Sequence, residues 1–381
     1  MTRPRIPFLS LVPGAPGNPD APGDDHDGRS VREGIDRVIA RGWFVLGPEG
    51  EAFEAEFASA MGASHAAGVG TGTDAIALIL RALGIGPGDE VITTPLSAAY
   101  TALGVMMAGA RPVFADIDPS RLTIDPEQIA RAIGPRTRAI LPVHLYGQPA
   151  DMAAIERLAS RHNLALVEDC CQAHLATAAG RPVGTIGVAG AFSFYPTKNL
   201  GAMGDGGAVV TSDAALAARI KRLRNGGQRD RYHHEEFGVN SRLDEMQAAV
   251  LRARLPRLAG WTARRRALAA AYRAALAGEP PTDLDVPPEH DPGHVYHLFV
   301  VRVRDRAKLQ AHLTSSGIET LIHYPVPIPR QPAMAGVNPQ DCPVAARACD
   351  EVLSLPLHPG LTDRDVADVV TALKGHDACV P

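Results

Sequence analysis

The sequence AFSFYPTKNLGAMGDGGA, residues 191–208, contains the features that decide the fold and the chemistry. Its apolar start is typical of a buried strand, and a Pro-Thr pair then turns the chain and presents Lys198 in a glycine-rich loop. A lysine held on ordered, irregular backbone beside the Ser193 hydroxyl is suited to a Schiff base next to a bound phosphate. The alternative is that Lys198 is a solvated surface residue, as most lysines in proteins are. We also expect a tight hairpin turn at 205–207.

Strand-like and helix-like segments alternate on both sides of this loop. Strands are predicted at 90–93, 112–115, 139–143, 165–167, 191–194 and 208–211, and helices at 74–83, 98–108, 126–133 and 152–162. Near-continuous apolar strands that alternate with helices indicate a mostly parallel sheet that is covered on both faces. The sequence therefore predicts an α/β fold.

The second half of the chain is expected to continue this domain and then form a smaller one. Ser212 is expected to cap a helix that runs to residue 225, and Ser241 to Asp244 to open a long helical stretch that bends or breaks near Pro256. After a Pro-rich acidic linker at 279–294, we predict strands at 297–303 and 319–324 and helices at 308–315, 343–353 and 363–373. We divide the chain into an N-terminal arm and first helix (1–40), a large domain (41–260) and a small C-terminal α/β domain (261–381).

Composition excludes several other classes of protein. The 381 residues are 45% hydrophobic and 21% charged with a net charge of −4, so neither disorder nor a binder of nucleic acid or anionic membrane is expected. There is no apolar run long enough to cross a membrane. Five cysteines, two of them adjacent, suggest no disulfide framework and no zinc site, so a cytoplasmic protein without a metal is expected. Residues 11–30, rich in Gly, Pro and Asp, are expected to form a mobile arm.

A second chemical signal lies at the end of a predicted strand, in LALVEDCCQAH (164–174). Ligands of α/β sheets bind at the carboxyl ends of the strands, where this sequence places Asp169. A carboxylate there can keep a pyridine nitrogen protonated, and Gln172 can hydrogen-bond a phenolic oxygen of the same ring. The alternative is that Asp169 only caps the following helix.

A third signal is the glycine-rich turn GVGTGTD (68–74) before a predicted helix. Backbone N–H groups of Gly72 and its neighbours at a helix N-terminus, with the Thr73 hydroxyl, form a cradle for a phosphate. The pattern also approximates a dinucleotide fingerprint, but the spacing of the third glycine and of the acidic residue does not match that motif.

The three blocks together resemble the DegT/DnrJ/StrS family of nucleotide-sugar aminotransferases. The similarity extends from about Arg41 to Leu361 and includes PVFADIDP, PVHLYGQPADM, VEDCCQAH, SFYPTKNLGAMGDGGA, GVNSRLDEMQAA and HYPVPIPRQPA. This resemblance implies the fold type I of pyridoxal 5′-phosphate (PLP) enzymes, which is aspartate-aminotransferase-like. It also implies a homodimer that takes a nucleotide sugar and an amino-acid donor.

The resemblance further implies a role for each matching residue. Lys198 is expected to bind PLP covalently and to move the proton at the substrate carbon. The other expected cofactor contacts are Asp169 at the ring nitrogen, Gln172 at the ring oxygen, Gly72, Thr73 and Ser193 at the phosphate, and Asn240, which would reach the phosphate of the partner's cofactor. Tyr324 and His323 are expected to approach the substrate, with a structural role as the alternative for His323.

Two departures from the family pattern concern the cofactor ring and the substrate. Where the family has a Thr-aromatic pair that stacks on the ring, this chain has Ser97-Ala98-Ala99-Tyr100, so Tyr100 is the candidate, with a place in the core as its alternative. Arg330 stands where the family commonly has His, and with Arg231 or Arg242 it is a candidate to bind the substrate diphosphate. A surface charge is the alternative for each.

The motifs are closest to members that aminate a dTDP-linked 3-keto-6-deoxyhexose with glutamate or glutamine as donor. A 4-keto sugar nucleotide and a keto-cyclitol are alternatives, as is a non-catalytic PLP-binding regulatory protein. Relatives that dehydrate a deoxysugar replace the lysine by histidine, so the presence of Lys198 favours transamination.

Overall fold

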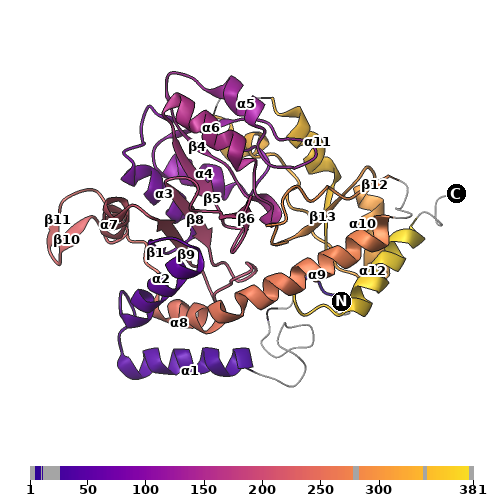
Figure 1. Ribbon diagram of the computed structural model, residues 1–381, viewed down its shortest axis with the longest axis horizontal. Helices are drawn as coiled ribbons and strands as arrows, with labels where there is room; N and C mark the ends of the chain where they lie inside the picture. The colour runs from indigo at the N-terminus through magenta and orange to yellow at the C-terminus, as the bar shows by residue number, and fades with distance from the viewer. Residues whose placement is uncertain (1–4, 10, 12–25, 278–282, 338–340, 377–381) are drawn as a thin grey trace.

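The computed structural model describes residues 5–9, 11, 26–277, 283–337 and 341–376, and a seven-stranded sheet lies at the centre of the larger part (Figure 1). Its order is β1 (His65–Val69), β9 (Gly207–Thr211), β8 (Ala189–Ser193), β5 (Ala165–Asp169), β4 (Thr137–Leu141), β2 (Glu90–Thr93) and β3 (Arg111–Phe114). β9 runs antiparallel to β1 and β8, and all other neighbours are parallel. The predicted mostly parallel α/β sheet is confirmed.

Helices cover both faces of this sheet because its strands are apolar on both sides. Val91 and Ile92 are adjacent in β2 yet lie in different hydrophobic cores. One core includes residues of α2 (Pro48–Ala60), α5 (Pro126–Ala132), α6 (Met152–His162) and α8 (Glu245–Arg254). The other includes residues of α3 (Gly72–Ala82), α4 (Tyr100–Met107) and α7 (Ala214–Leu223). The first helix, α1 (His26–Arg41), packs on α8.

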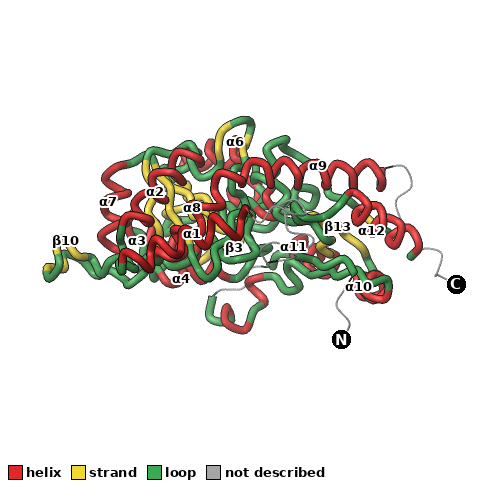
Figure 2. Tube along the Cα trace, turned by 90° about the horizontal axis from the view of Figure 1, so that it is seen from below, coloured by secondary structure: helices red, strands yellow, loops and turns green. Residues whose placement is uncertain are grey.

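The C-terminal elements form a second sheet with its own core at one end of an elongated molecule (Figure 2). The antiparallel sheet has the order β12 (Leu284–Asp285), β13 (Phe299–Val303) and β14 (Val352–Leu355). α10 (Arg306–Ser315) and α11 (Pro343–Glu351) pack on this sheet, and α12 (Asp363–Gly375) packs on α9 and α10. The predicted break near Pro256 is confirmed, since α8 ends at Arg254, the 3₁₀ turn η2 (Leu255–Arg257) follows, and α9 (Leu258–Ala277) then runs to the C-terminal elements.

The predicted strand at 319–324 is wrong. This segment makes a single bridge, Leu321 to Ser354, while β14 occupies the place beside β13. β14 follows α11 directly, at a position where only a helix to residue 353 was expected. The segment instead leads into the 3₁₀ turns η3 (Ile328–Arg330) and η4 (Pro332–Met334).

Three local predictions about turns and caps are also wrong. Residues 205–207 are not a tight hairpin, because a loop over 194–206 separates β8 from β9. The carboxylate of Asp213, not Ser212, caps α7, which ends at Leu223. Ser241 does not cap α8, because its hydroxyl donates to Asp74.

Shorter elements complete the chain. They are β6 (Thr177–Ala178), β7 (Arg181–Pro182), the 3₁₀ turn η1 (Leu145–Gly147) and the hairpin β10 (Gln228–Asp230) with β11 (His233–His234), which projects from the body in both views (Figures 1 and 2). Of the expected arm at 11–30, residues 12–25 lie outside the described part, and 26–30 begin α1. Among the described helices, none combines the length and apolar character needed to cross a bilayer.

Candidate active site

The phosphate cradle forms where the glycine-rich turn meets the end of β8. A methyl group at Gly72 would come within 2.9 Å of Ser193 Cβ and 2.7 Å of Cys171 Sγ, so only glycine allows this approach. Thr71 caps α3 by accepting a hydrogen bond from Asp74 N (3.0 Å). Gly72, the first residue of α3, therefore lies against Ser193, and the free N–H groups at a helix N-terminus beside a serine suit an anion.

A buried carboxylate lies at the neighbouring strand end. Asp169 is the last residue of β5 and is 4% exposed. Its Oδ2 accepts from the Thr101 hydroxyl (2.8 Å) and its Oδ1 from the backbone N–H of Cys171 (3.1 Å). The carboxylate is thus held in one orientation and is not a helix cap. Sequence reasoning missed Thr101, because its contact joins positions far apart in the chain.

Lys198 lies half-buried on the loop after β8, where its backbone N–H donates to Tyr195 O (2.8 Å). Burial lowers the pKa of the ammonium below its usual value, while Cys171 and Asp169 raise it. A lowered pKa increases the fraction of neutral amine, the form that attacks a carbonyl. The negative charge of Asp169 thus acts on the Lys198 amine, so the two groups belong to one site.

Three histidines around Lys198 are kept neutral. Burial, followed by the positive charge of Lys198, lowers the pKa of His174 to about 3 and that of His323 to about 4. The same causes hold the pKa of His297 well below its usual value. These three rings are therefore neutral near pH 7.

Gln172 connects the main sheet with the C-terminal part of the site. Its Oε1 accepts from the backbone N–H of Tyr146 (2.7 Å), and its Nε2 donates to the Tyr324 hydroxyl (3.0 Å). The Tyr146 hydroxyl donates to the carbonyl of His323, whose Nδ1 lies 2.9 Å from Ser354 Oγ. Burial raises the pKa of Tyr324, so its phenol stays protonated. Gln172, His323 and Tyr324 therefore form one network at the site.

The remaining candidates lie outside this network. Tyr100 is 65% exposed at the start of α4, so the alternative that it fills the core is wrong, and Thr101 beside it makes the contact with Asp169. Arg330 is exposed in η3, and its positive charge acts to lower the pKa of the Cys342 and Cys349 thiols, which burial raises. Asn240 is exposed at the base of the β10–β11 hairpin, where it bridges to Asn225.

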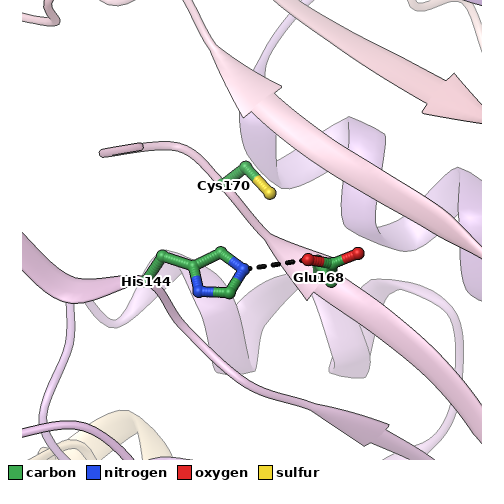
Figure 3. A group of neighbouring side chains, drawn as sticks. All are labelled: His144, Glu168 and Cys170. Atoms are coloured by element: carbon green, nitrogen blue, oxygen red, sulfur yellow. Dashed lines mark hydrogen bonds and ion pairs between the residues drawn. The ribbon is translucent and has the colours of Figure 1, made fainter. Parts of the chain in front are cut away.

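A buried cluster behind Asp169 combines His144, Glu168 and Cys170, whose ligand-type atoms lie within 4.8 Å of one another (Figure 3). The Glu168 carboxylate accepts from His144 Nε2 (3.1 Å) and from the backbone N–H groups of residues 184, 186 and 187 (2.7–2.8 Å). His144 Nδ1 accepts from Ala150 N, which leaves the proton on Nε2. Both oxygens are therefore engaged, and the cluster anchors the loop over 182–188 behind the site.

Replacing Glu168 with glutamine is expected to lower the free energy of unfolding by about 2–4 kcal/mol, because an amide group would face backbone N–H donors in a dry interior. Urea unfolding at fixed protein concentration measures this loss. Glu156→Gln is the matched control, since Glu156 pairs with the exposed Arg181, and we expect it to change stability by less than about 1 kcal/mol. Equal stability of the two variants would contradict the anchoring role.

The site combines a lysine, a strand-end carboxylate and an anion cradle at adjoining strand ends of an α/β sheet. This donor set fits PLP, whose phosphate, ring nitrogen and aldehyde carbon need an anion site, a carboxylate and an amine. Fold and site together define a PLP-dependent enzyme of fold type I.

The chain belongs to the DegT/DnrJ/EryC1/StrS aminotransferase family, whose model matches residues 26–374. It is 50% identical over 378 residues to the dTDP-3-amino-3,4,6-trideoxy-α-D-glucose transaminase of Streptomyces venezuelae, covering 97% of this chain and 96% of that protein. The crystal structure of S. venezuelae DesV superposes with a TM-score of 0.91 at 48% identity over 99% of this chain and 100% of that one. NtdA of Bacillus subtilis, solved with the cofactor PMP, superposes with a TM-score of 0.87 at 30% identity, covering 98% of this chain and 86% of NtdA. The predicted family, fold and cofactor are confirmed.

Proposed function

We propose that this aminotransferase moves the amino group of glutamate to the C3 keto group of a dTDP-linked 3-keto-6-deoxyhexose. The observation that carries the proposal is the complete donor set of Lys198, Asp169 and the Gly72 cradle in a chain half identical to a dTDP-3-amino sugar transaminase. A regulatory protein that only binds the cofactor has no need of a lysine with a lowered pKa.

In this proposal each side chain acts on a stated part of the reactants. Bound PLP carries the amino group between donor and acceptor and withdraws electrons from the bond that breaks. Lys198 would hold the cofactor covalently, and after the substrate amine has displaced it, its free Nζ would move the proton at the substrate carbon. Asp169 keeps the ring nitrogen protonated, and Gln172 donates to the ring oxygen.

The other predicted residues complete the site. The phosphate lies at Gly72, Thr73 and Ser193. Tyr324, fixed by Gln172, and the neutral ring of His323 face the sugar. We also propose that Tyr100 stacks on the cofactor ring and that Arg330 binds the diphosphate, although both positions depart from the family pattern. The four cysteines in the described residues are free thiols, which agrees with our placing of the protein in the cytoplasm.

Turnover with glutamate is expected for dTDP-3-keto-6-deoxyglucose and its 4-deoxy analogue. The 4-keto isomer and scyllo-inosose are the comparison acceptors, and products are assigned by NMR. Amination at C4 only, or of the cyclitol only, would overturn the C3 assignment. If no amino donor changes the visible absorbance of the PLP-loaded protein, the regulatory alternative holds instead.

We also propose a homodimer in which Asn240 of each chain reaches the phosphate site of the other. The β10–β11 hairpin above Asn240 projects from the body, and Tyr232 and Phe237 on this segment are 77% and 94% exposed. Exposed aromatic side chains of this size are typical of an interface.

Coexpression of Lys198→Ala and Asn240→Ala chains tests this dimer. Each variant alone is expected to be inactive or weak, whereas a mixed dimer has one site with both groups intact. With random pairing, about a quarter of the wild-type activity should return. A monomer with full turnover, or a mixture no more active than its parts, would contradict the composite site.

A further inference from the structure

A cavity of about 300 Å³ lies beside Lys198, between the lysine loop, the start of α9 and the segment after β14. Its lining includes Lys198 and Met203 of the lysine loop and Trp261 and Arg265 of α9. Lys198 is one of its lining residues, so a molecule in this cavity lies beside the lysine loop. Its size is at the lower end for small-molecule sites, which suits an amino acid better than a nucleotide sugar.

The unusual group in this lining is Arg265, which is 4% exposed. All of its hydrogen bonds are made by Nη1, to the carbonyl oxygens of Tyr296, His297 and Leu357 (2.7–3.2 Å). In the described part of the chain no carboxylate lies within ion-pair distance of it, and its buried Nε has no hydrogen-bond partner. Its neighbour Arg264, by contrast, pairs with Asp363 (2.8 Å).

A buried cation without a counter-ion is costly, because desolvation is not offset by an opposite charge. Burial alone lowers the pKa of Arg265 to about 10, so the guanidinium remains charged near pH 7. An anion in the adjoining cavity would supply the missing charge. The three carbonyl oxygens accept hydrogen bonds from Nη1 only, which is one of the three nitrogens of the guanidinium group.

We propose that this cavity binds a carboxylate group of the amino donor, with Arg265 as its counter-charge, while the donor amine faces Lys198. The inference rests on the proposed aminotransferase function and adds to it the place where the donor is recognised. A carboxylate suits a guanidinium in a small, partly apolar cavity, and Trp261 supplies apolar surface for the methylene groups of a dicarboxylic amino acid.

Glutarate, a dicarboxylate that cannot transaminate, tests the cavity without any reaction. Trp261 reports binding in a Trp43→Phe background, since these are the two tryptophans of the chain. We expect saturable quenching by glutarate that weakens about tenfold or more in Arg265→Met and less than threefold in Arg265→Lys. Arg264→Met, which removes the neighbouring half-buried arginine of the same helix, is the matched control and should bind as the parent does.

Because Arg265→Met also loses three hydrogen bonds, a second pair of variants leaves Arg265 in place. Met203 lines the cavity and is 45% exposed, so both replacements can be accommodated. Met203→Glu puts a competing carboxylate at the cavity and should weaken glutarate binding about tenfold relative to Met203→Gln. Equal binding by these two variants would overturn the proposal.

The two half-reactions separate the donor from the sugar nucleotide. With Met203→Glu, the rate of the absorbance change with glutamate at sub-saturating concentration should fall about tenfold, and the change driven by the keto sugar should not. Loss of the sugar half-reaction alone, or displacement of glutarate by dTDP, would assign the cavity to the nucleotide and overturn the proposal. If wild type binds glutarate but glutamate never reacts, the proposed function fails while the carboxylate site stands.

Discussion

Replacing Lys198 with alanine is expected to lower transamination by about 10⁴-fold or more, because in the proposed function one amine serves as covalent anchor and as proton carrier. The fixed backbone of the loop and the lowered pKa of the amine are both specific to this position. None of the three neutral histidines around Lys198 is an amine, so none of them can replace the lysine. The visible spectrum of the variant with added PLP reports the loss of the covalent bond to the cofactor. Steady-state turnover reports the loss of transamination.

Lys308→Ala is the control, since Lys308 lies in the first turn of α10 on the C-terminal part of the molecule. We expect it to keep the wild-type spectrum and turnover. Borohydride reduction of the PLP-loaded wild type should place the label on the peptide that contains Lys198. A label on another lysine, or an active Lys198→Ala variant, would refute the assignment.

The central sheet and the core of the site could be predicted because both depend on local sequence. The strands of this mostly parallel sheet have buried apolar centres, and the residues at their carboxyl ends follow them directly. Gly72, Asp169 and Ser193 are such positions, and strand pairing brings them to one edge of the sheet. The glycine-rich turn adds a steric requirement that only one residue type meets.

What could not be predicted depends on contacts between distant segments. Thr101 acts on Asp169, 68 residues further along the chain, and nothing around it in sequence marks it as a site residue. The segment at 319–324 alternates like a strand, but β14 forms the ladder with β13 in its place. Arg265 lies in a run of three arginines that reads as a solvated helix face, yet packing buries one of them.

Replacing Asp169 with asparagine is expected to reduce turnover by about 10²–10³-fold, an effect second only to that of the lysine. The carboxylate accepts from the Thr101 hydroxyl and the Cys171 N–H, and as an anion it can also keep a ring nitrogen protonated. The amide has the same size but no charge, so the protonated ring is no longer favoured and electron withdrawal weakens.

The charge effect can be separated from the loss of structure. Asp213→Asn is the matched control, because Asp213 caps α7 and asparagine caps a helix about equally well. Thr101→Val removes the hydroxyl that orients Asp169 but keeps its charge, so its loss should be smaller, about tenfold. The expected order of turnover is therefore Asp213→Asn, then Thr101→Val, then Asp169→Asn, with the covalent spectrum on Lys198 retained in all three. An Asp169→Asn variant as active as the Thr101→Val variant would mean that the carboxylate only positions the ring and that its charge does not drive the chemistry.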